Sequence, residues 1–141
     1  MRKFYLTIQI LLFTVIFNEL QAQYCIPVYT HGCELGDGLT HFSLNTISQA
    51  IPCSGIPNYY HDYTAISTDL AKTGYYLISA KSSSAGLYVS VWIDYDDNTT
   101  FNNAEELVQQ FVCTTIGVTY SVPITIPASA TTGTTRLRIL S

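Results

Sequence analysis

A dense group of carboxylates follows an alternating stretch in the second half of this 141-residue sequence. Residues 87–93 place Leu, Val, Val and Ile at every second position, which is the pattern of a packed β-strand. Five carboxylates are then gathered in one short segment: Asp94, Asp96, Asp97, Glu105 and Glu106. Carboxylates crowded in this way repel one another unless a cation lies among them. The segment 94–106 is therefore a candidate divalent-cation loop.

The spacing within this segment is that of a calcium loop. Counted from Asp94, side-chain oxygens fall at the ligand positions of the 12-residue EF-hand loop. These positions hold Asp94, Asp96, Asn98, Thr100, Asn102 and Glu105. Hard oxygen ligands favour calcium over zinc or copper, and extracellular calcium modules bind with a Kd of about 10⁻⁴ to 10⁻³ M.

Two features of the segment depart from an EF-hand. Thr99 stands where the sharp turn requires glycine, and no helical pattern flanks the loop. The alternative is a solvated loop whose Asp and Asn side chains bond their own backbone in Asx-turns.

The elements that must position this loop are predicted to be β-strands. No sustained 3.6-residue apolar stripe occurs beyond residue 22, whereas alternation and turn residues recur. Strands are expected at 40–47, 75–80, 87–94, 107–112, 117–126 and 134–140, with a tyrosine-rich segment at 58–64. About seven short strands predict an all-β fold, an antiparallel two-sheet β-sandwich of the Ig-like or jelly-roll-like kind. Pro123 cannot donate a ladder bond, so its strand is expected at a sheet edge or a bulge.

Residues 1–22 have the three-part plan of a secretory signal peptide. Arg2 and Lys3 precede an apolar run over 8–17, and cleavage is expected after Ala22. That run is about half of the roughly 20 residues that span a bilayer, so no transmembrane anchor is expected. The sequence thus predicts one domain, 23–141, secreted to the extracellular space or cell surface.

The charge of this domain argues against nucleic acid as a partner. Without residues 1–22, four Lys and Arg face nine Asp and Glu, which is a formal charge of −5. A nucleic-acid surface needs clustered cations to neutralise phosphates.

All four cysteines lie in the exported part: Cys25, Cys33, Cys53 and Cys113. Export favours disulfides, and four cysteines allow three connectivities among which the sequence does not choose. A disulfide in the first third would attach the turn-rich N-terminal arm to the sheet. A metal site of Cys25, Cys33 and His31 is the alternative, but no zinc-type spacing supports it.

No catalytic motif is present, so we do not expect an enzyme. His31, His41 and His61 are scattered, and neither a nucleophile elbow nor an H-E-x-x-H pattern occurs. The aromatic residues suggest a different function, a carbohydrate-binding surface. Its candidate rings are Tyr59, Tyr60, Tyr63, Tyr88 and Trp92.

Several short motifs follow one another along the chain. They are Tyr24-Cys25, Gly32-Cys33, the YYHDYT segment, Lys72 to Tyr76, Trp92 to Tyr95, Ile126-Pro127 with Ala130 and Gly133, and Arg136 to Arg138. This pattern resembles the GEVED-domain family, β-sandwich modules of exported bacterial proteins. The resemblance implies an accessory or adhesion-type module, often found beside peptidase or sorting domains. The sequence does not identify its partner, for which a surface glycan and another exported protein are the candidates.

The same resemblance bears on the acidic loop and on the chain's end. In the family the loop reads roughly Trp-Ile-Asp-aromatic-Asn-x-Asp-Gly, and its later glutamate corresponds to Glu106 instead of Glu105. Asn98-Thr99 replaces the family's Asp-Gly. The Gly-Glu-Val-Glu-Asp segment is expected after Arg138, yet the sequence stops at Ser141. The resemblance therefore implies a domain without its last strand, as in a fragment, a truncated gene or a shortened relative.

Overall fold

The computed structural model describes residues 24–28, 32–53, 59–102 and 104–141. Seven strands and one short 3₁₀ helix occur within these ranges, in the order η1 (Cys33–Leu35), β1 (Leu39–Leu44), β2 (Ile47–Ala50), β3 (Tyr75–Ser82), β4 (Leu87–Ile93), β5 (Leu107–Cys113), β6 (Tyr120–Thr125) and β7 (Leu137–Leu140). The predicted signal peptide lies outside the described residues. Within them, no helix is long and apolar enough to cross a membrane.

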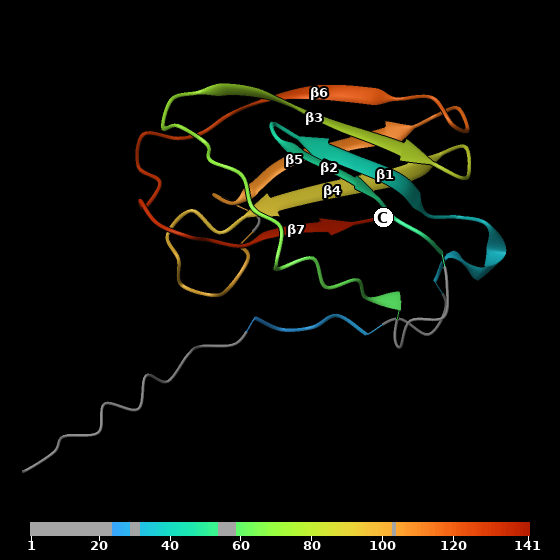
Figure 1. Ribbon diagram of the computed structural model, residues 1–141, viewed down its shortest axis with the longest axis horizontal. Helices are drawn as coiled ribbons and strands as arrows, with labels where there is room; N and C mark the ends of the chain where they lie inside the picture. The colour runs from blue at the N-terminus through green and yellow to red at the C-terminus, as the bar shows by residue number, and fades with distance from the viewer. Residues whose placement is uncertain (1–23, 29–31, 54–58, 103) are drawn as a thin grey trace, which may run out of the picture.

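The strands form two antiparallel sheets, which confirms the all-β sandwich. One sheet has the order β2-β1-β3-β6, and the other has the order β5-β4-β7. In Figure 1, β3 and β6 lie in the upper part of the molecule and β4 and β7 lie below them. Strand β6 carries Pro123 and is an edge strand, as its missing N–H requires.

The core fills the space between the sheets with side chains two residues apart. From β4 it receives Val89, Val91 and Ile93, which are at most 5% exposed. Their partners in β7 are Ile139 opposite Val91 and Leu137 opposite Ile93, so both side chains of β7 face inward. The alternation over 87–93 therefore predicted the inward face of β4 correctly.

The first expected strand, 40–47, is in fact a hairpin. β1 ends at Leu44, Asn45 and Thr46 form the turn, and Leu44 pairs with Ile47 of β2. Asn45 has φ 51°, a left-handed conformation that asparagine tolerates better than most residues. The turn contains no glycine or proline, which is why the sequence pattern did not reveal it. Residues 59–64 form no strand.

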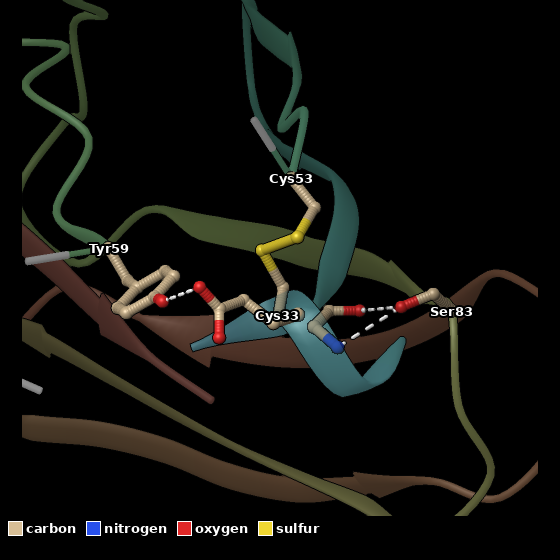
Figure 2. The surroundings of a disulfide bond; sticks show 6 residues. Cys33, Cys53, Tyr59 and Ser83 are labelled. Atoms are coloured by element: carbon tan, nitrogen blue, oxygen red, sulfur yellow. Dashed lines mark hydrogen bonds between the residues drawn. A yellow bond between two sulfur atoms is a disulfide. The ribbon is translucent and has the colours of Figure 1, made fainter. Parts of the chain in front are cut away.

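A disulfide attaches the N-terminal part to this hairpin. Cys33 in η1 is bonded to Cys53, three residues beyond β2, with Cα atoms 5.6 Å apart. Figure 2 shows the bond beside two further contacts, from Tyr59 to Glu34 and from the Gly38 N–H to the Ser83 hydroxyl at 3.1 Å. Because Cys33 is oxidised, it does not serve as a metal ligand with Cys25, while His31 lies outside the described residues.

The other two cysteines are free thiols. Cys25 is exposed, whereas Cys113 at the end of β5 is fully buried. Burial raises the pKa of the Cys113 thiol, partly offset by its hydrogen bond with Ser82.

Candidate cation-binding loop

The acidic loop is the hairpin connection between β4 and β5. Because Trp92 pairs with Leu107, the chain leaves β4 and enters β5 at neighbouring points. The Ile93 N–H donates to the Glu106 carbonyl at 3.1 Å, and the Asp94 N–H donates to the Arg136 carbonyl at 3.0 Å. Antiparallel pairing thus places Asp94 and Glu106 side by side although twelve residues separate them in sequence.

Three carboxylates converge at this point. Oxygens of Asp94, Asp96 and Glu106 all lie within 4.8 Å of one another. Asp94 and Glu106 are 0% and 1% exposed, while Asp96 is exposed. Two buried carboxylates and a third at the rim offer oxygen ligands of the kind that calcium prefers.

The contacts of Asp94 are with neutral donors. Its Oδ2 accepts from the Tyr24 hydroxyl at 2.6 Å and from the Thr99 N–H at 2.9 Å, and its Oδ1 accepts from the Asn98 N–H at 3.2 Å. Burial raises the pKa of Asp94, but these hydrogen bonds together outweigh burial and hold the pKa below its usual value. Asp94 is therefore ionised at neutral pH.

Glu106 holds both ends of the loop. Its Oε1 accepts from the Tyr95 N–H at 3.1 Å, and its Oε2 accepts from the Asn102 N–H at 2.9 Å. Among the described residues, each oxygen thus has one hydrogen-bond donor and retains capacity for a further partner, since a carboxylate offers about four lone-pair sites.

Asx-turns shape the intervening backbone. Asp96 Oδ1 accepts from the Asn98 N–H at 3.1 Å, and Asn98 Oδ1 accepts from the Thr100 N–H at 2.8 Å. Asn102 Oδ1 accepts from the N–H groups of Ala104 and Glu105 at 3.0 and 2.9 Å. The self-bonding that the sequence offered as an alternative to a cation thus occurs, together with the convergence of the three carboxylates.

The remaining predicted ligands do not belong to the converging group. Asn98 and Thr100 are exposed, and Asn98 Nδ2 donates to Asp96 Oδ2 at 2.7 Å. Glu105, the ligand by EF-hand spacing, is exposed and outside the converging group, which contains Glu106 instead. Thr99, which stands where the sharp turn requires glycine, adopts a left-handed backbone conformation with φ 68°.

Sequence reasoning did not identify Tyr24 as part of this site. Its hydroxyl reaches Asp94 across 70 residues of sequence, its ring lies 5.3 Å from that of Phe101, and the Arg136 guanidinium lies 4.9 Å from its centroid. No spacing or periodicity relates residue 24 to residue 94, so only the folded chain shows this contact.

The five candidate sugar-binding rings come from two segments of the chain, 59–63 and β4. Tyr59, Tyr60 and Tyr63 follow β2, where the Tyr63 hydroxyl donates to the Ala50 carbonyl at 3.2 Å. Tyr88 and Trp92 are on the outer face of β4, opposite to its buried valines. Of the five only Tyr88, at 75% exposure, is an exposed side chain.

A separate hollow of about 1250 Å³ lies beside β7. Apolar core residues line much of it, among them Leu44, Ile47, Leu70 and Ile139. The three converging carboxylates do not border it.

Comparison with known families gives a match in the C-terminal part of the chain. Searches of curated proteins and of solved structures found no match. One family model matches the chain. The matched residues all lie in the second half of the sequence and do not include the motifs between Tyr24 and Tyr76. Residues 88–141, which contain most of β4, the acidic loop and β5 to β7, match the GEVED domain family, as their motifs predicted.

Proposed function

We propose that this domain is a non-catalytic accessory module of an exported protein, acting in adhesion, whose loop 94–106 binds calcium. The observation that carries the proposal is the convergence of Asp94, Asp96 and Glu106, two of them buried. Buried carboxylates within 4.8 Å of one another repel strongly at low local dielectric. A calcium ion between them would turn this repulsion into attraction and would fix the β4–β5 connection.

The arrangement around His61 and Asp62 supports a non-catalytic role. The His61 ring stacks on Tyr63 with centroids 5.6 Å apart, and the Asp62 carboxylate accepts from the Thr64 N–H at 2.9 Å. Both side chains therefore serve local structure in a turn. The Cys33–Cys53 disulfide supports an exported location, since disulfides persist in oxidising compartments.

A thermal melt of residues 23–141 with calcium and with a chelator tests the cation site. A ligand that binds only the folded state stabilises it by about 1.4 to 2.7 kcal/mol at ten to a hundred times its Kd. For weak binding this corresponds to a rise in Tm of about 5 to 10 °C at about 10 mM calcium. Magnesium at the same concentration is the control for ionic strength.

Two neighbouring glutamates provide matched variants. Glu106→Gln should abolish the calcium-dependent rise in Tm, because it removes a converging carboxylate. Glu105→Gln should retain the rise, because its side chain is exposed outside the group. Equal melts of the wild type with calcium and with chelator would refute the cation site, and an equal loss in both variants would refute this ligand set.

A further inference from the structure

The chain from Tyr24 to Val28, here called the N-terminal strap, is attached to the domain without strand pairing. Figure 1 shows its blue start beside the golden loop that connects β4 and β5. Ile26 and Val28 are 51% and 72% exposed, so the middle and end of the strap bury little apolar surface. Within the strap, the hydrogen bonds and ring contacts to the rest of the domain come from its first two residues.

Tyr24 and Cys25 contact two elements. The Tyr24 hydroxyl donates to Asp94 at 2.6 Å, and its ring packs against Phe101. An Arg138 guanidinium nitrogen donates to the Cys25 carbonyl, and the same guanidinium lies 4.4 Å from the Phe101 centroid. Alternating aromatic rings and guanidinium groups thus hold the strap against the loop and the residues of β7.

Both side chains that Tyr24 contacts in the loop belong to the segment 94–106 that carries the three carboxylates. Asp94 begins it and Phe101 lies within it, so a change in loop conformation displaces two of the groups that hold the strap. Two equilibria that share the same groups are coupled, and the coupling is reciprocal. We propose that docking of the N-terminal strap and calcium binding by the loop 94–106 favour each other, with Tyr24 as the positioning residue of Asp94.

The sign of the coupling follows from the charges. Without a cation, repulsion among the three carboxylates favours an open loop, which separates Asp94 and Phe101 from Tyr24. A bound cation removes this repulsion and closes the loop onto the strap. In return, the Tyr24 hydroxyl is one of three donors from the described residues that hold Asp94 in its buried orientation. This inference rests on the calcium site of the proposed function.

The test uses two tyrosine variants of residues 23–141. Calcium affinity is measured by titration calorimetry for wild type, Tyr24→Phe and Tyr88→Phe. Loss of a hydrogen bond to a charged group should weaken calcium binding by about tenfold in Tyr24→Phe. Tyr88→Phe removes a hydroxyl from a side chain that is 75% exposed and should bind as the wild type does.

A second readout reports on the strap itself. Cys25 is an exposed thiol and Cys113 is buried, so a thiol-reactive fluorescent dye labels the strap selectively. Calcium should raise the anisotropy of this dye in the wild type and in Tyr88→Phe, and should leave it unchanged in Tyr24→Phe. A change in fold stability alone would not produce this pattern.

The outcomes separate the two proposals. If the wild type binds calcium but Tyr24→Phe binds it equally or more tightly, or the dye does not respond, the coupling is refuted and the calcium site stands. If the wild type binds no calcium, the proposed function and the coupling both fail. At saturating calcium, a lower dye anisotropy in Tyr24→Phe than in Tyr88→Phe would support attachment of the strap through Tyr24, and equal values would refute it.

Discussion

The side chain of Tyr95 packs against the core directly after the buried Asp94, and its buried hydroxyl has no hydrogen-bond partner among the described residues. A buried hydroxyl without a partner is destabilising, because it has lost its hydrogen bonds to water. Tyr76 is the contrasting case, since its hydroxyl accepts from the Ala71 N–H at 2.7 Å. The two tyrosines thus differ in what their hydroxyls contribute.

Tyr95→Phe should therefore increase the free energy of unfolding by about 1 kcal/mol. Tyr76→Phe should decrease it by a similar amount, since the Ala71 N–H then loses its acceptor. Urea unfolding followed by circular dichroism measures both. A loss of stability in Tyr95→Phe would show that its hydroxyl makes a favourable contact.

The same residue predicts a dependence on alkaline pH. Burial raises the pKa of Tyr95 from 10.0 to about 12, so the folded state favours the protonated form. Below pH 10 the Tyr95 hydroxyl is protonated in both the folded and the unfolded state, and its ionisation does not affect the free energy of unfolding. As the pH rises from 10 toward 12, only the unfolded state loses this proton, so the free energy of unfolding decreases. The stability advantage of Tyr95→Phe over the wild type should therefore grow above pH 10, as measured by urea unfolding across this range. A constant difference would contradict the raised pKa.

At the scale of the element, the β4–β5 loop contains a backbone conformation that its sequence does not favour. Thr99 has φ 68°, and a β-branched residue in the left-handed region is strained. The conformation nevertheless directs the Thr99 N–H to Asp94 at 2.9 Å. The residue that the sequence marked as a departure from a calcium loop thus adopts the turn that such a loop requires.

Thr99→Gly should relieve this strain. The left-handed penalty of about 1 to 2 kcal/mol exceeds the entropic cost of glycine, so a net gain in stability of about 0.5 to 1 kcal/mol is expected. Thr100→Gly is the control, because Thr100 has no positive φ and its hydroxyl donates to Asn98, so this change should destabilise. Thermal melts of both variants measure the change in stability. A gain in Tm in both variants, or in neither, would contradict backbone strain at Thr99.

At the scale of the whole molecule, one covalent bond attaches the N-terminal part to the sandwich. The Cys33–Cys53 disulfide closes a loop with a sequence separation of 20. Its removal by Cys33→Ser with Cys53→Ser should cost roughly 3 kcal/mol by the loop-entropy account. The comparison is made by urea unfolding under oxidising conditions.

Thiol titration tests the same cysteine arrangement. The native chain should present one rapidly reacting thiol, Cys25, and a second, Cys113, only when denatured. Two rapidly reacting thiols in the native state, or no additional thiol after denaturation, would contradict an exposed Cys25 and a buried Cys113.

The amino-acid sequence alone indicated the features that depend on near neighbours. Alternation over 87–93 predicted the inward face of β4, and the missing N–H of Pro123 predicted a sheet edge or a bulge, of which the structure has the edge. Both follow from the geometry of a single strand. The carboxylates of the loop could also be identified, because they are near neighbours in the sequence. The Asn45-Thr46 turn was missed, since it uses a left-handed asparagine without glycine.

Tertiary structure decided what depends on pairing between distant segments. The register of β4 against β5 places Glu106, and not Glu105, beside Asp94, because a shift of one residue in a strand reverses the side to which its side chain points. The choice of Cys53 for Cys33, and the approach of Tyr24 to Asp94, likewise need the packed sheets. Local periodicity carries no information about which segments meet, so these contacts appear only when the chain folds.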